Sequence, residues 1–123
     1  MKPNKNKKMD LKNVYAGVMT SDIEKSLKFY ENLFDRESDY NPMKILHEWD
    51  FQDGGVLQLV EDKDRAGKSS ITLLVENIDS VRKSLEEKNI QVEQKTESEI
   101  AKTITISDPE NNRITFAENI QGR

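Results

Sequence analysis

The sequence predicts an α+β protein built from two βαβββ modules, whose strands form a curved mixed sheet with a concave cup. An amphipathic helix pattern at 21–34 has a counterpart at 77–88, and each of them follows a strand-like run. A strand pattern at 55–61 returns at 112–118, a displacement of 57 residues from position 55 to position 112. Such self-similarity indicates one supersecondary unit used twice. Because two helices are too few to cover both faces of the strands, one face should stay open and form the cup.

Length and charge limit the organisation and the partners of the chain. A chain of 123 residues has the size of one domain, expected at 13–119 and divided into module one (13–61), a linker (62–68) and module two (69–119). Residues 1–12 hold five Lys and one Asp, so we expect a disordered basic tail there. The net charge of −4 for the whole chain leaves −8 for the rest, which argues against nucleic acid as a partner.

The sequence also lacks segments and residue types that other classes of protein need. No run approaches the roughly 18 apolar residues of a membrane span, and the basic N-terminus has no apolar signal-peptide stretch. We therefore expect a cytoplasmic protein without a membrane partner. The absence of Cys excludes disulfides, thiolate metal sites and thiol nucleophiles.

Module one should begin with a strand at 14–19. Ser21, with Glu24 three residues later, forms a capping-box pattern, so we expect the first helix to begin there. Its apolar stripe should face the core and consists of Ile23, Leu27, Tyr30 and Phe34. Further strands are expected near 36–41, 44–51 and 55–60, the last of them after a turn at Gly54 and Gly55.

Module two should begin with a strand at 70–75. Asn77 is the expected N-cap of the second helix, and Asn89 is a plausible left-handed residue after its end. The buried stripe of this helix should consist of Ile78, Val81 and Leu85. Strands are expected near 90–95, 102–107 and 113–118, with a turn at 108–112 in which Asn tolerates a positive φ.

Three segments carry a resemblance to a known family. They read VMTSDIEKSLKFYENLF (18–34), LLVENIDSVRKSLEEKNI (73–90) and DPENNRI (108–114), where Asn111 replaces a glycine of the family turn. Together with the repeat they resemble the vicinal oxygen chelate superfamily, which includes glyoxalase I, bleomycin-resistance proteins, fosfomycin-resistance enzymes and extradiol dioxygenases. The resemblance covers 13–119. It implies the cupped fold, but fold alone does not fix the function.

The resemblance also implies where metal-dependent members would place their ligands. In this sequence those positions are Tyr15, Gln58, Ser70 and Thr115. None of the four is an imidazole or a carboxylate, and a divalent ion needs such donors to replace its hydration shell. Glu61 and Glu118 lie an odd number of residues beyond two of these positions, so we expect them on the opposite strand face as exposed charges. We therefore expect no metal and no other cofactor.

Neutral hydrogen-bonding side chains are the expected lining of the cup. These ligand-binding candidates are Tyr15, Gln58, Ser70, Thr72, Thr103 and Thr115, with Met19 and Leu74 as apolar walls. The alternative is that these polar groups simply face water. Trp49 is a further candidate that either fills the core against a helix or stacks on a ligand. His47 shares the strand face of Trp49 and is the last candidate, and a packed strand histidine is favoured over a general base.

The leading hypothesis is therefore a metal-free protein that binds a small organic molecule, with cationic and aromatic molecules as the candidates. The resemblance to bleomycin-resistance proteins implies a homodimer with grooves shared between subunits. No catalytic residue is assigned. Two alternatives stay open: a metal-dependent lyase or isomerase resembling glyoxalase I, with Gln58 and atypical ligands, and a non-catalytic dimeric scaffold.

Overall fold

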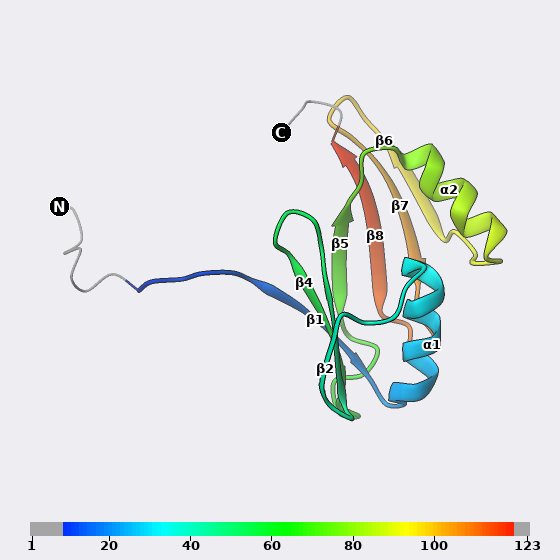
Figure 1. The fold of residues 1–123 in the computed structure, drawn as a ribbon. Coiled ribbons are helices and arrows are strands. Elements are labelled where there is room, and N and C mark those ends of the chain that lie inside the picture. The colour runs from blue at the N-terminus through cyan, green and yellow to red at the C-terminus, as the bar shows by residue number, and fades with distance from the viewer. Residues whose placement is uncertain (1–8, 120–123) are drawn as a thin grey trace.

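The computed structural model describes residues 9–119 and contains two helices and eight strands (Figure 1). Module one contains β1 (Tyr15–Thr20), α1 (Ile23–Phe34), β2 (Tyr40–Met43), β3 (Leu46–Asp50) and β4 (Val56–Glu61). Module two contains β5 (Ser70–Leu74), α2 (Ile78–Glu87), β6 (Gln94–Glu97), β7 (Ala101–Ser107) and β8 (Arg113–Asn119). This order confirms the α+β class and the repeated βαβββ plan. Most of the predicted basic tail, residues 1–8, lies outside the described residues.

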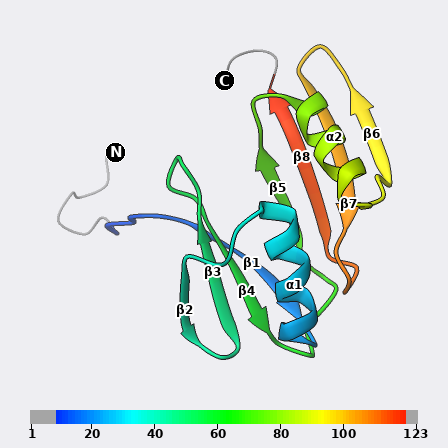
Figure 2. The same ribbon diagram turned by 45° about the vertical axis from the view of Figure 1, so that its right-hand side comes forward.

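Each module forms one mixed four-stranded sheet. The strand orders are β1-β4-β3-β2 and β5-β8-β7-β6, so the first and last strands of each module are neighbours. These neighbours, β1 with β4 and β5 with β8, pair in parallel, and the other pairs are antiparallel. Both helices lie on the same side of the two sheets (Figures 1 and 2). The opposite side carries no helix, and we call it the helix-free face. None of the described helices has the length and apolar character to cross a membrane.

The two helices begin at capping residues of different kinds. Asn77 caps α2 as predicted, because its side chain accepts hydrogen bonds from the backbone N–H groups of Asp79 and Ser80 at 2.9 and 3.1 Å. Asp22, not Ser21, caps α1, since its carboxylate accepts from the backbone N–H of Lys25 at 3.2 Å. The prediction of a Ser21 cap was wrong because the Ser21 backbone N–H and hydroxyl both donate to Glu110 of module two.

Two glutamates complete the helix starts and correct another prediction. Glu61 accepts a hydrogen bond from the backbone N–H of Ile23 at 3.2 Å, and Glu118 accepts one from the backbone N–H of Ile78 at 2.8 Å. We expected exposed strand-end charges, but both residues are half-buried. Their side chains lie on the helix side of the sheets, where a carboxylate satisfies an N–H group that the first helical turn leaves without a partner.

Two short strands lie a few residues later than predicted. In module one the chain leaves α1 through Asp35, which has a φ of 58°, so β2 starts at Tyr40 and not near 36. In module two, β6 starts at Gln94 and not near 90. Ile90 and Val92 pack against the core without belonging to a strand. The strand was predicted too early because the alternating apolar residues at 90 and 92 contact the core and do not pair with a neighbouring strand.

The core fills the space between each sheet and its helix. In module one it is aromatic, because the buried Tyr30 and Trp49 pack together with Phe34. In module two it is mostly aliphatic and consists of Ile71, Ile78, Leu85, Ile104, Ile106, Ile114 and one aromatic residue, Phe116.

The turn between β7 and β8 joins module two to module one. The Tyr30 hydroxyl donates to the Asp108 carboxylate at 2.6 Å, and the Asn112 amide donates to the Met19 carbonyl at 2.7 Å. Burial, followed by the neighbouring Asp108 charge, raises the pKa of Tyr30 far above its ordinary value, so the hydroxyl keeps the proton that it donates. Asn111 has a φ of 72°, which confirms the predicted positive φ in this turn.

The linker between the modules packs against the same turn. Gly67 has a φ of 79°, and a Cβ atom at this position would lie 2.5 Å from the Glu110 carbonyl oxygen. Only glycine fits there without a shift of the backbone. The linker and the turn therefore hold the two modules in one arrangement.

Candidate functional site

The strand register of module one determines which side chains reach the helix-free face. Residues paired across neighbouring strands point to the same side of a sheet. Gln58 on β4 pairs with Glu48 on β3, whereas Leu57 pairs with Trp49 and lies on the helix side. Tyr15 on β1 pairs with Val56, two residues from Gln58, and so shares its face. The predicted pair Tyr15 and Gln58 therefore lies on the helix-free face.

Module two presents a continuous group of hydroxyls on the same face. Thr72 on β5 pairs with Thr115 on β8, which in turn pairs with Thr105 on β7. The Thr105 and Thr115 hydroxyls are 3.0 Å apart and hydrogen-bonded. Ser70 and Thr103 are each two residues from a member of this row and share its face. All four module-two candidates, Ser70, Thr72, Thr103 and Thr115, therefore lie on one surface.

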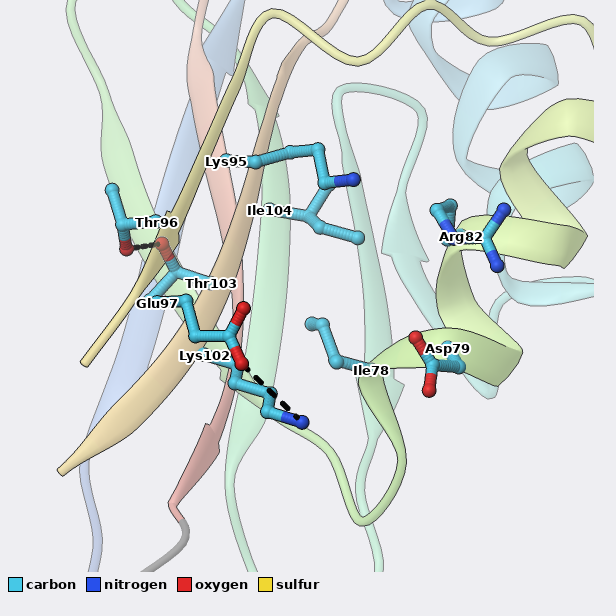
Figure 3. A pocket seen from close by; sticks show the side chains of 9 residues that line it. All are labelled: Ile78, Asp79, Arg82, Lys95, Thr96, Glu97, Lys102, Thr103 and Ile104. Carbon is cyan, nitrogen blue, oxygen red and sulfur yellow. Dashed lines mark hydrogen bonds and ion pairs between the residues drawn. The ribbon is translucent and has the colours of Figure 1, made fainter. Parts of the chain in front are cut away.

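Thr96 extends this hydroxyl row to the edge of the sheet. It pairs with Thr103, and their hydroxyls are hydrogen-bonded. Figure 3 shows both threonines on the opposite side of β6 and β7 from α2. Because a hydroxyl can donate and accept, the row can adapt to ligand groups of either kind.

The helix-free face of module one contains a carboxylate that was not among the candidates from the sequence. Glu48 is only 9% exposed, and its carboxylate accepts a hydrogen bond of 2.7 Å from the Gln58 amide. Its chain neighbours His47 and Trp49 were candidates, whereas Glu48 itself was not. The antiparallel pairing of the strands at 44–51 and 55–60 is the signal that would have placed it next to Gln58.

Trp49 and His47 lie on the other side of the sheet. Trp49 is 0% exposed, and its ring lies 5.6 Å from that of Phe34, so of the two alternatives for this residue the core position is the one observed. His47 is half-buried, and its Nδ1 atom is hydrogen-bonded to the Ser38 hydroxyl at 2.8 Å. The structure therefore separates these two candidates from the other six.

Exposed apolar and aromatic side chains surround the polar groups of the helix-free face. Tyr15 at the start of β1 and Leu74 at the end of β5 are both exposed. Tyr40 on β2 pairs with Glu48 and adds a second exposed tyrosine to this face. Its position on this face could not be recognised from the sequence, because β2 pairs irregularly with β3.

The open edge between the two sheets adds a cleft to this surface. A cavity of about 330 Å³ lies between the start of β1 and β5, and Ser70 and Thr72 are among its lining residues. A second cavity of about 490 Å³ shares Phe51, Thr72 and Leu73 with the first and is lined largely by apolar side chains. These volumes lie within the range of small-molecule sites. The hydroxyls of β5 thus border an apolar space.

The donor groups of this surface do not match the needs of a divalent metal ion. The four family ligand positions supply a phenol, an amide and two hydroxyls. Of the two β3 carboxylates on the same face, Glu48 already accepts a hydrogen bond from Gln58, and Asp50 is exposed at the end of the strand. No group of three or more His, Asp or Glu side chains that could hold a metal is present in residues 9–119. Neutral oxygens replace the hydration of a divalent ion poorly.

The family model of the Glyoxalase/Bleomycin resistance protein/Dioxygenase superfamily matches residues 13–116, so the chain belongs to this superfamily. It is similar to the crystal structure of a glyoxalase/bleomycin resistance protein from Catenulispora acidiphila DSM 44928, with 28% identity, a TM-score of 0.79 and coverage of 86% of this chain and 96% of the other. No curated protein matches the sequence significantly.

Two further structures show that this fold occurs in proteins with different functions. One is TnmS3, an antibiotic binding protein from Streptomyces sp. CB03234, with 21% identity, a TM-score of 0.77 and coverage of 91% of this chain and 99% of that one. The other is a lactoylglutathione lyase from Agrobacterium tumefaciens, with 15% identity, a TM-score of 0.75 and coverage of 89% and 95%. At these identities the similarity establishes the fold, and the function has to be argued from the site.

Proposed function

We propose that this protein binds a small organic molecule without a metal ion, on the helix-free face and in the adjoining cleft between the modules. One observation carries the proposal. At the positions where metal-dependent members of the superfamily hold their ion, this chain places the neutral groups of Tyr15, Gln58, Ser70 and Thr115, and a hydroxyl row and a cleft adjoin them. Such a surface provides hydrogen bonds and apolar contact, which are what binding of an organic molecule requires.

The arrangement favours an aromatic cation as ligand. Tyr15 and Tyr40 are exposed aromatic rings on the helix-free face, and rings of this kind attract both aromatic groups and cations. Glu48 is the carboxylate of this face that is mostly removed from water, and among residues 9–119 only the neutral Gln58 amide donates to its side chain. A charge-assisted hydrogen bond from a ligand cation to Glu48 would offset its desolvation. TnmS3, with the same fold, binds an antibiotic, which supports this class of ligand.

We also propose a homodimer that encloses the ligand between two subunits. Residues 9–14 extend away from the body of the protein (Figure 1). Met9, Leu11 and Val14 on this arm are 78–80% exposed, and Val14 also lines the cleft between the modules. Large apolar side chains in water indicate a contact surface. Light scattering should give twice the chain mass of 14.2 kDa, and Leu11→Asp should shift it toward the monomer, whereas Ile100→Asp, at an exposed site on the β6–β7 hairpin, should not.

Calorimetric titration with the aromatic cation ethidium tests the ligand proposal. Binding should persist after EDTA treatment, and Glu48→Gln should weaken it about tenfold, the effect of roughly 1.4 kcal/mol. Glu87→Gln, at an exposed position on α2, removes the same charge and should leave the affinity unchanged. Binding that disappears with EDTA and returns with Zn²⁺ or Ni²⁺ would instead support the metal-dependent lyase. No binding before or after EDTA would contradict an aromatic cation as ligand.

A further inference from the structure

We propose a second binding site, for a small organic monoanion such as an alkyl carboxylate, in the groove between α2 and the β6–β7 hairpin. This groove lies on the helix side of module two, on the opposite side of the sheet from the helix-free face (Figure 3). Its volume is about 290 Å³, at the lower end of the range for small-molecule sites. The proposal is independent of the ligand proposed for the helix-free face.

The groove exists because α2 does not cover the whole sheet. The helix packs on β7 and β8, and β6 lies at the sheet edge beyond them. Ile78 at the start of α2 and Ile104 on β7 are both buried and line the groove from opposite sides. Figure 3 shows both isoleucines directed into the space between the helix and the strands. The floor of the groove between the helix and the strands is therefore apolar.

Positive charge surrounds this apolar surface. Lys95 extends from β6 toward α2, and Arg82 lies across from it on the helix (Figure 3). With Lys102, three cations line the groove against the two carboxylates of Asp79 and Glu97, a net charge of +1 for the lining residues alone, and Glu86 pairs with Arg82 from outside the lining. The chain as a whole has a net charge of −4. An anion approaching this acidic protein would thus find a locally favourable potential in the groove.

The partners of these cations indicate which of them is available to a ligand. Lys102 forms an ion pair with Glu97 at 3.8 Å, and Arg82 forms one with Glu86 at 3.2 Å. The ammonium group of Lys95 has no hydrogen bond or ion pair with any residue of the described range 9–119. Its ammonium group can therefore bind an anion without breaking an existing contact, and Arg82 can add a second charged donor from the opposite wall.

The charge of the lining also sets the charge of the ligand. With Arg82 paired to Glu86 and Lys102 to Glu97, the one charge of the Lys95 ammonium group balances a monoanion, whereas a dianion would bring a second negative charge close to Asp79. The buried isoleucine surface favours a ligand with a short alkyl or aryl group over an inorganic ion. A monocarboxylate with such a group meets both conditions.

An NMR titration of the ¹⁵N-labelled protein with sodium hexanoate tests the site. Saturable shifts should be confined to amides around the groove, including those of Ile78, Lys95 and Ile104. Lys95→Gln should weaken binding about tenfold, within the range for loss of a charge-assisted hydrogen bond. Lys83→Gln is the matched control, because Lys83 is an exposed lysine on α2 outside the groove.

Three outcomes would overturn the proposal. Shifts that do not saturate, or that spread over the surface, would show non-specific attraction. Equal effects of Lys95→Gln and Lys83→Gln would show that only the overall charge matters. If hexan-1-ol bound as tightly as hexanoate, the carboxylate group would not contribute to binding, and the proposed anion site would be refuted. Glu48→Gln, on the opposite face, should leave hexanoate binding unchanged, which separates this test from that of the helix-free face.

Discussion

Module one fills the space beneath its helix with the rings of Tyr30, Phe34 and Trp49, whereas module two fills the equivalent space mainly with isoleucine and leucine. The helix-free faces differ as well. Module one presents two exposed tyrosines and the Glu48 carboxylate, and module two presents a row of hydroxyls. The same backbone plan therefore accepts different cores and different surfaces, because the strand register fixes only the side to which each residue points.

The acceptor for the first backbone N–H of the helix is a glutamate in both modules. Glu61 is the last residue of β4 and Glu118 the last but one of β8, and both accept a hydrogen bond from the first backbone N–H of their helix. Such N–H groups need a partner in either module, whatever the core contains. The comparison teaches that backbone requirements preserve the repeat, while packing and surface chemistry vary around it.

The largest effect should come from the aromatic core of module one. Trp49→Ala removes a completely buried indole and should lower the free energy of unfolding by about 4 kcal/mol, as typical for a large aromatic residue. Leu85→Ala in the core of module two should cost about 3 kcal/mol. Both values can be measured by urea denaturation.

Tyr40→Ala provides the control for the aromatic core, since Tyr40 is exposed and its loss should cost no more than about 0.5 kcal/mol. If Trp49→Ala were as mild as Tyr40→Ala, the difference between a buried and an exposed aromatic residue in module one would be refuted.

A smaller and nearly equal effect is expected at the two capping glutamates. Glu61→Ala and Glu118→Ala each remove the acceptor for one helix N–H, so each should lower the free energy of unfolding by about 1 kcal/mol. Urea unfolding of the two variants measures both changes in the free energy of unfolding. Glu87→Ala, at an exposed position on α2, should cause no such loss. A clear loss in one variant and none in the other would show that the two modules do not share this requirement.

The smallest effect concerns the contact between the modules in which Glu110, in the β7–β8 turn of module two, accepts hydrogen bonds from Ser21 of module one. Hydrogen bonds from the Ser21 hydroxyl and backbone N–H, with one from Thr20, hold the pKa of Glu110 below its ordinary value. Because the folded state lowers this pKa, the ionised form stabilises the fold above the unfolded pKa of roughly 4.3, and this contribution disappears as the pH falls through the folded pKa.

Glu110→Gln should therefore be less stable than the natural chain at about pH 7, and the difference should shrink toward about pH 3. Urea midpoints measured across this range test the expectation. Asp53→Asn, at the equivalent position in the exposed hairpin of module one, should show no such pH-dependent difference. A difference for Glu110→Gln that stays constant with pH would mean that the carboxylate charge does not contribute to the link between the modules.

The repeat and the alternation of side chains made most of the fold and part of the site predictable. The family resemblance assigned Ser70 and Thr115 to one face, alternation along the strand adds Thr72 to the face of Ser70, and the structure places all three there. Parity alone does not say which face a helix covers. For that reason His47 and Trp49 stayed among the candidates, although the structure places them beneath α1.

Contacts between residues distant in the sequence were outside the reach of local patterns. The two oxygens of the Asp108 carboxylate serve Tyr30, 78 residues away, and the turn itself. Glu110 accepts hydrogen bonds from the Ser21 hydroxyl and from the Ser21 backbone N–H, which a local capping box would have paired with Glu24. A local motif states only which partner lies nearby in the chain, and an acceptor of the same kind brought close by the fold can replace it.

The sequence by itself determined the two modules, the helix starts near Asp22 and Asn77, and the parity of the strand residues, because these depend on short-range backbone geometry and periodicity. Tertiary structure alone decided the pairing of Glu48 with Gln58, the junction at the β7–β8 turn and the groove beside α2. These features depend on which strands become neighbours and on how far a helix covers its sheet, and both are set by packing between distant segments.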